Sequence, residues 1–225
     1  MRVGMDIMMK IIAATGNKDK VKEIKEILQD MAVCVVTMKE AGLSQEAEEN
    51  GTTFLENAVI KAEAVAGKAA ESGEWKDAVV MADDSGLVID ALNGEPGIYS
   101  ARYLGHETSY REKNADLIKR LEGVPEEKRS ARFICAIAAV CPGGKVLTAE
   151  AAMEGRIGYE EQGENGFGYD PIFYLPEAGC TSAQLSPEEK NRISHRGKAL
   201  RIMRERLTEL EQSRTAGEQS AEENR

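Results

Sequence analysis

Short apolar runs alternate with amphipathic segments over the first 70 residues. Residues 8–14 (MMKIIAA) are mostly apolar and end at Thr15-Gly16-Asn17, a pattern typical of a buried strand followed by a turn. From Val21 to Leu28 the apolar side chains recur at helical spacing, with lysines and glutamates between them. Residues 31–38 (MAVCVVTM) are apolar again. We therefore expect a strand, a helix and a second strand, the order that opens many α/β proteins.

The rest of the chain continues this alternation. A helical pattern covers residues 55–69, and an apolar strand at 78–82 runs into Asp83-Asp84-Ser85-Gly86, after which extended structure is expected to resume at 87–92. Further expected elements are a helix over 109–122, a hairpin of strands 132–140 and 145–153, a strand at 172–175, and helices that start after Ser186 and Ser194. The pattern predicts an α/β fold in one compact unit, with two lobes around a cleft.

The last residues differ from the rest in composition. Residues 212–225 (QSRTAGEQSAEENR) contain no Leu, Ile, Val or aromatic side chain, so they offer little apolar surface for burial. We expect a single domain over 9–211 and a disordered acidic tail over 212–225.

Composition and charge exclude several classes of partner. The 225 residues include 29 Lys+Arg and 39 Asp+Glu, which gives a formal charge of -10 that repels nucleic acids and anionic membranes. No apolar run approaches the roughly 20 residues of a membrane span, and the start lacks a signal-peptide pattern. The four cysteines form no CxxC pair that would indicate a zinc site. We expect a cytoplasmic protein that binds no nucleic acid and no membrane.

The first strand leads into a segment that could bind phosphate. It comprises Thr15, Gly16, Asn17, Lys18, Asp19 and Lys20. The N–H groups at a helix N-terminus attract anions, and glycine allows a close approach of the backbone. In the alternative interpretation Asn17 only caps the helix and Lys20 is solvated.

Two adjacent carboxylates after an apolar strand are the second candidate. Asp83 and Asp84 could ligate Mg²⁺ and accept a proton from an attacking water, or they could belong to an Asp-rich turn. On the preceding helix, Asn57 and Lys61 are four residues apart and share a polar face.

A third group of residues could recognise a base. Phe167, Gly168, Tyr169 and Asp170 combine aromatic rings, a flexible glycine and a carboxylate. Lys190, His195 and Arg196 add donors and positive charge near the expected helix starts. Each of these two sets also has an ordinary structural interpretation, as a turn before a strand or as charges at a helix end.

Six motifs occur together in one order: TGNKDK, ENAVIKA, ADDSGL, GEPGIYSARY, FGYDPIF and EKNRISHRGKAL. In this combination the chain resembles the Ham1/RdgB family of inosine/xanthosine triphosphate pyrophosphatases, from about Lys10 to Leu210. The resemblance implies an elongated α/β protein in which a mixed sheet is flanked by helices and two lobes surround a nucleotide cleft. It also implies a homodimer, Mg²⁺ as cofactor, and hydrolysis of ITP, dITP or XTP to the monophosphate and pyrophosphate.

The resemblance also implies residue roles. Asp84 would be the proton acceptor and lie near the metal, Glu49 would assist the metal, and Ser85 would touch the substrate. The triphosphate would be bound by the segment from Thr15 to Lys20 and by Lys61. The base would be bound by Phe167, Gly168, Tyr169, Asp170, Lys190, His195 and Arg196, the last two facing the 6-keto oxygen.

One departure and two alternatives remain open. Asp19 stands where the family often has a small residue, so it either weakens phosphate binding or points away from the site. The alternatives are a broader pyrophosphatase that removes damaged or excess nucleotides, and a nucleotide-binding module without turnover. The second is less compatible with Asp83, Asp84, Lys20 and Lys61 all being present, because a pure binder needs no group that activates water.

Overall fold

A mixed sheet forms the centre of the computed structural model, which describes residues 8–43 and 47–223, the last ten of them as backbone only. Within these residues seven strands form one sheet in the order β2-β1-β3-β4-β5-β6-β7. The strands are β1 Met9–Ala13, β2 Val33–Thr37, β3 Val79–Ile89, β4 Ser130–Val140, β5 Val146–Ile157, β6 Phe173–Leu175 and β7 Cys180–Thr181. β1 pairs in parallel with β2 and β3, and the other pairs are antiparallel. The predicted α/β class with a mixed sheet is confirmed.

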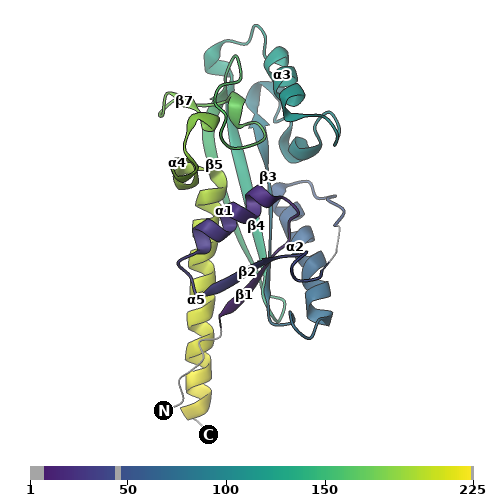
Figure 1. Cartoon of the computed structure of the whole chain (residues 1–225), viewed down its shortest axis with the longest axis vertical. Helices are drawn as coiled ribbons and strands as arrows, with labels where there is room; N and C mark the ends of the chain where they lie inside the picture. The colour runs from purple at the N-terminus through teal and green to yellow at the C-terminus, as the bar shows by residue number, and fades with distance from the viewer. Residues whose placement is uncertain (1–7, 44–46, 224–225) are drawn as a thin grey trace.

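Helices cover both faces of this sheet (Figure 1). The α-helices are α1 Lys18–Leu28, α2 Phe54–Glu71, α3 Tyr110–Arg120, α4 Pro187–Ile193 and α5 His195–Glu223. Short 3₁₀ helices are η1 Asp90–Leu92, η2 Gly97–Arg102, η3 Glu126–Lys128, η4 Asp170–Ile172 and η5 Ser182–Gln184. β3 and β4 can therefore be buried on both of their sides, whereas β5 keeps exposed positions such as Glu150 and Glu154.

The alternation of side chains along β1 and β3 separates two cores. Ile11 and Met81 point to the face covered by α1 and α5, where they pack with Leu200 and Met203. Ile12 and the neighbours of Met81 point to the other face, which α2 covers with a row of alanines. Adjacent residues of a strand thus belong to different cores, as the two-residue period of a strand requires.

A third core lies at the end of the molecule that contains α3 (Figure 1). Leu87 and Ile89 at the end of β3 pack there with Leu117 of α3 and with Phe133 and Phe173. The long strands β3, β4 and β5 therefore join the two ends of the molecule. The single domain over 9–211 stays a prediction.

Two segments differ from the expectations. β3 runs without interruption from Val79 to Ile89, so residues 83–86 are the middle of one strand and not a junction between two strands. α5 continues to Glu223, so the backbone of 212–223 is helical where the composition predicted disorder. Glutamate, glutamine, arginine and alanine are good helix formers and can extend an existing helix without a new core. Residues 224 and 225 of the expected tail lie outside the described residues.

No helix within the described ranges combines the length and apolar character needed to cross a membrane.

Candidate active site

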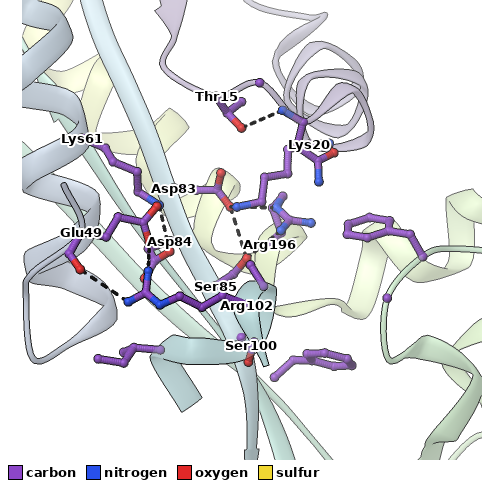
Figure 2. Close-up of a pocket in the computed structure, with 18 of the residues that line it drawn as sticks. Thr15, Lys20, Glu49, Lys61, Asp83, Asp84, Ser85, Ser100, Arg102 and Arg196 are labelled. Atoms are coloured by element: carbon purple, nitrogen blue, oxygen red, sulfur yellow. Dashed lines mark hydrogen bonds and ion pairs between the residues drawn. The ribbon is translucent and has the colours of Figure 1, made fainter. Parts of the chain in front are cut away.

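An open cleft of about 560 Å³ lies between the part of the molecule that contains α1 and α2 and the part that contains α3. One side is built by the β1–α1 turn, α2 and the middle of β3. The other is built by η2, the loop around Phe167, and the region where α4 passes into α5. Figure 2 shows charged side chains from these separate elements converging on one space. The topology thus assembles chemistry from residues far apart in sequence.

The β1–α1 turn presents the start of a helix to the cleft. The Asn17 side chain accepts hydrogen bonds from the backbone N–H groups of Asp19 (2.9 Å) and Lys20 (3.2 Å), which confirms its interpretation as an N-cap. Thr15, Gly16, Asn17 and Lys20 all line the cleft. Lys18 and Asp19 do not: both are exposed, and Asp19 lines a smaller cavity of about 200 Å³ beside α1. The prediction that these two residues contact the substrate therefore has no geometric support.

Asp83 points to the face of the sheet covered by α1 and α5. Its carboxylate forms ion pairs with Lys20 of α1 (3.0 Å) and Arg196 of α5 (3.2 Å), and its side chain is 2% exposed. Burial alone would raise the pKa of Asp83, but the two cations outweigh burial and hold the pKa well below its usual range. Asp83 is therefore an ionised anchor between the two helices.

Asp84, the next residue, points to the face covered by α2. Its carboxylate accepts hydrogen bonds from Lys61 (2.8 Å) and from the Asn57 side chain (3.3 Å). The polar helix face predicted for Asn57 and Lys61 is thus the face that meets Asp84. Burial on its own would lower the pKa of Lys61, but Asp84, together with Asp83 and Glu49, raises it. The positive charge of Lys61 is therefore fixed beside Asp84.

Glu49 lies on the same side of the cleft as Asp84. Its carboxylate is 3.4 Å from Lys61 and 3.6 Å from Arg102, the last residue of η2. Figure 2 shows the Glu49 side chain between these two cations. Lys61 thus bridges Glu49 and Asp84, two residues predicted to be near a metal.

The donor set of Glu49 and Asp84 fits Mg²⁺. Carboxylate oxygens are hard ligands, and Mg²⁺ is often held by one or two carboxylates together with substrate phosphates and water. Among the residues that the structure describes, no three His, Cys, Asp or Glu side chains are grouped so as to hold a metal by themselves. An ion at this position would therefore take further oxygen ligands from water or from a bound phosphate.

The loop around Phe167 forms the opposite end of the cleft. Asp170 accepts hydrogen bonds from the Phe167 backbone N–H (2.9 Å) and from Lys190 (2.5 Å), and the Lys190 ammonium lies 4.9 Å from the centre of the Phe167 ring. Tyr169 is buried, and its hydroxyl donates to the Ser100 carbonyl (2.7 Å). Phe167 and Gly168 line the cleft, and the contacts of Asp170 and Tyr169 hold the loop that carries them. Tyr169 is therefore part of the core, as the structural interpretation of this segment predicts.

His195 is buried at the start of α5. Its ring stacks on Phe133 at 4.9 Å between centroids, and its Nδ1 atom has no hydrogen-bond partner in the described part of the chain. Burial, together with Arg196 and Lys190, lowers the pKa of His195 well below its usual value near 6.5. The side chain is therefore a neutral imidazole at neutral pH.

Arg196, which follows it, is only 3% exposed and bonds inside the protein. It pairs with Glu23 (2.6 Å) and Asp83 and donates to the Ser85 hydroxyl (2.9 Å). Three of its donors thus hold α1, β3 and α5 together. This arrangement gives Arg196 an anchoring role, and the three bonds do not use all five of its N–H donors, so the expected contact with a base stays a prediction.

Three further residues were given no role by the sequence analysis. Glu23 has the pattern of a solvated helix residue, and only its pairing with Arg196, 173 positions away, gives it a role. Tyr110 lines the cleft and meets the Tyr169 ring edge-on at 5.2 Å. Arg102 belongs to GEPGIYSARY, one of the motifs that carries the resemblance, so its signal was present in the sequence.

Comparison with known proteins gives consistent matches over most of the chain. The model of the Ham1 family matches residues 11–206. A dITP/XTP pyrophosphatase of Caldanaerobacter subterraneus subsp. tengcongensis is 48% identical over 198 residues, which cover 88% of this chain and 96% of that protein. The protein of the same name from Bacillus subtilis is 48% identical over 197 residues, with the same two coverages.

Solved structures agree with these matches. A HAM1 protein from Coxiella burnetii superposes with a TM-score of 0.79 at 41% identity, covering 90% of this chain and all of that one. The Staphylococcus aureus Ham1 protein gives a TM-score of 0.77 at 40% identity, covering 88% of this chain and 98% of that one. Both the fold and the sequence therefore correspond along nearly the whole length of these proteins.

Proposed function

The chain belongs to the Ham1 family, and on this premise we propose that it hydrolyses non-standard purine nucleoside triphosphates. The substrates are ITP, dITP and XTP, and the products are the nucleoside monophosphate and pyrophosphate. Relatives at 48% identity are named dITP/XTP pyrophosphatases. The reaction removes these nucleotides from the pool available for nucleic-acid synthesis.

One observation carries this proposal: Asp84 and Lys61 form a 2.8 Å pair on the wall of the cleft, with Glu49 beside them. A carboxylate on the wall of the cleft can accept a proton from water, and the neighbouring ammonium can stabilise negative charge that develops on phosphate oxygens. A module that only bound nucleotides would need no group that accepts a proton from water.

In the proposed reaction Asp84 orients a water and takes one of its protons. The water oxygen forms a bond to the α-phosphorus, and the bond from that phosphorus to the bridging oxygen of the pyrophosphate group breaks. Lys61 and Lys20 stabilise the negative charge that moves onto the leaving pyrophosphate. The N-terminus of α1, with Thr15 and Asn17, binds the phosphate chain.

Glu49 and Asp84 are the residues that would hold Mg²⁺. When bound, the ion would polarise phosphate oxygens and neutralise part of the triphosphate charge. Before substrate arrives, Lys61 and Arg102 balance the charge of these carboxylates.

Recognition of the base is proposed for the other end of the cleft. Phe167 offers a ring for stacking, and Lys190 and Asp170 hold its loop. Inosine and xanthosine carry a 6-keto acceptor where adenosine carries an amino donor, so donors at that position select against adenosine. Guanosine shares the keto oxygen, so its exclusion is expected to come from its 2-amino group. His195, with the N–H groups of Arg196 that the protein does not use, is the proposed donor set.

A parallel assay of pyrophosphate release from ITP, XTP, GTP, ATP and UTP tests the proposal. We expect ITP and XTP to be hydrolysed with a much higher kcat/KM than the other three. Similar rates for all five would indicate the broader pyrophosphatase instead. Nucleotide binding without release of pyrophosphate would indicate a module without turnover.

The remaining features of the proposal follow from the resemblance and from the charge. We propose a homodimer in the cytoplasm that acts on free nucleotides and not on nucleic acid. The formal charge of -10 supports the last point, since a negatively charged protein repels the many phosphates of a polymer more strongly than the three of one nucleotide. Size-exclusion chromatography with light scattering tests the dimer.

A further inference from the structure

Arg102 is a cation of the cleft to which the mechanism above assigns no contact with substrate. It ends η2, the 3₁₀ helix of the GEPGIYSARY motif, and it lines the cleft. The Ser100 hydroxyl, two residues earlier, accepts a hydrogen bond from the Leu87 backbone N–H (2.9 Å) and so fastens η2 to β3. Lys113 of α3 donates to the Ala101 carbonyl from the other side (2.8 Å). The backbone that carries Arg102 is therefore fixed relative to the strand that carries Asp84.

The guanidinium itself is held loosely. It lies 3.6 Å from the Glu49 carboxylate and 3.4 Å from the Glu49 carbonyl, and it stacks on the Tyr99 ring at 5.0 Å. These polar distances are long for a charge-assisted hydrogen bond, which is ordinarily 2.7–2.9 Å. An arginine has five N–H donors, so most of those of Arg102 are not used by the protein.

The other cations of the cleft are bound more tightly and are less exposed. Arg196 is 3% exposed with partners at 2.6 and 3.2 Å, and Lys190 is 8% exposed with a partner at 2.5 Å. Lys20 and Lys61 are 16% and 17% exposed, each with a carboxylate within 3.0 Å. Arg102 is 29% exposed. Of these five cleft-lining side chains, Arg102 has the longest distance to its carboxylate partner and the largest exposed fraction.

From this comparison we infer that Arg102 binds a phosphate group of the substrate, exchanging its contact with Glu49 for one with phosphate oxygens. The inference rests on the proposed function, because it concerns the triphosphate in the same cleft. A planar guanidinium can bind two phosphate oxygens at once, which an ammonium cannot. A polyphosphate brings more negative charge than Glu49 alone, so it competes successfully for this cation.

The test measures binding of the two products, which share the phosphates of the substrate between them. Inorganic pyrophosphate and inosine monophosphate are titrated calorimetrically into wild type, Arg102→Ala and Arg102→Lys, with EDTA present so that Glu49 cannot act through a metal. We expect the affinity for at least one of them to fall about tenfold or more in both variants, as expected for loss of a hydrogen bond between charged groups. With Mg²⁺ present, kcat/KM for ITP should fall about 10- to 100-fold.

Two controls separate contact with phosphate from simpler explanations. Arg111→Ala removes an exposed positive charge from nearby α3 and should leave both affinities unchanged. In a Glu49→Gln background, Arg102→Ala should still weaken binding, because the contact is with the ligand. The lysine variant keeps the charge and tests the inference if Arg102→Ala does not fold.

Two results would overturn the inference. One is unchanged affinity for both ligands in the arginine variants, or an absence of binding to wild type. The other is a loss that disappears in the Glu49→Gln background, which would make Arg102 a residue that only positions Glu49. If wild type binds these ligands through Arg102 but does not hydrolyse ITP, the proposed function fails and the contact of Arg102 with phosphate stands.

Discussion

Asp83 and Asp84 are chemically identical neighbours with different surroundings. The pleat of β3 turns Asp83 toward α1 and α5, where Lys20 and Arg196 surround a carboxylate that is almost fully buried. It turns Asp84 toward α2 and the cleft, where its side chain is 10% exposed. The first environment suits an anchor, and the second suits a group that meets a water molecule.

Changing Asp84 to asparagine should therefore remove activity but keep the fold. An amide has the shape of a carboxylate but cannot accept the proton of the attacking water, so we expect kcat to fall by about 10²- to 10⁴-fold. Pyrophosphate release from ITP measures the loss, and circular dichroism with a thermal melt checks the fold. Near wild-type turnover in a folded variant would move the role of base to another group.

The same change at Asp83 should act mainly on stability. Asp83→Asn leaves Lys20 and Arg196 without their shared carboxylate in a buried setting, and breaking such a pair costs about 3–5 kcal/mol in the free energy of unfolding. Urea denaturation of the two asparagine variants side by side measures this difference. Equal stabilities for Asp83→Asn and Asp84→Asn would contradict the anchoring role.

His195 should make stability depend on pH near 6. Its pKa is lowered in the folded state, so the unfolded chain binds a proton first as the pH falls below about 6.5. The stability is complete above that pH and declines below it. Between pH 7.5 and 5.5, wild type should lose up to about 1.4 kcal/mol more of its unfolding free energy than His195→Gln does.

The other histidine gives a matched control. His106→Gln removes the other imidazole, from an exposed position, and controls for the substitution itself. Carboxylates titrate in all three proteins and cancel in the comparison. Parallel urea-unfolding profiles for wild type and His195→Gln would show that the imidazole is not kept neutral by burial.

At the scale of elements, the sequence predicted strands and helices well where apolar periodicity controls them. The β4–β5 hairpin and the Ser186 cap of α4 are confirmed, because each depends on local signals. β3 is the informative exception: the residues Asp-Asp-Ser-Gly suggest a break, yet they are mid-strand. Their charges are tolerated because Lys20, Lys61 and Arg196 neutralise them, and these partners come from three different helices that no local pattern connects to β3.

α5 should be needed only in its first half. The side chains of α5 that are buried in the core end at Leu207 within the described part of the helix, and Leu210 packs against its edge. We expect truncation after Gln212 to shift the melting temperature by less than about 2 °C and to leave turnover unchanged.

A second truncation provides the contrast. Ending the chain after Leu200 removes Met203 and Leu207, and each such loss costs about 2–5 kcal/mol, which exceeds what a marginally stable domain tolerates. That variant should not fold. A large drop in melting temperature on truncation after Gln212 would mean that residues beyond 212 contribute contacts to the fold.

For the whole molecule, charge is distributed unevenly. The chain carries a formal charge of -10, but Lys20, Lys61, Arg102, Lys190 and Arg196 all line one cleft. Each is paired with a carboxylate, so the cleft is ready to exchange internal ion pairs for contacts with a phosphate chain. The sequence indicated most of these residues through its motifs, but not which of them bond to one another.

Turnover should require a divalent metal, although the fold should not. The carboxylates of the cleft already have cationic partners, so EDTA should abolish pyrophosphate release from ITP while the melting temperature stays constant, and added MgCl₂ should restore activity. The measurement combines the release assay with a thermal melt on the same samples. Unchanged turnover in EDTA would show that Glu49 and Asp84 serve no metal.

The ion pairs of Asp83 with Lys20 and Arg196 have a consequence for folding during synthesis. The ribosome produces β3 and Lys20 long before it produces Arg196. Until residues up to Leu207 emerge, the apolar face that α5 covers is open to water and Asp83 lacks half of its counter-charge. A nascent chain that lacks α5 therefore has an incomplete core and an incomplete cleft, and a premature stop before α5 should yield an aggregation-prone fragment and not a weak enzyme.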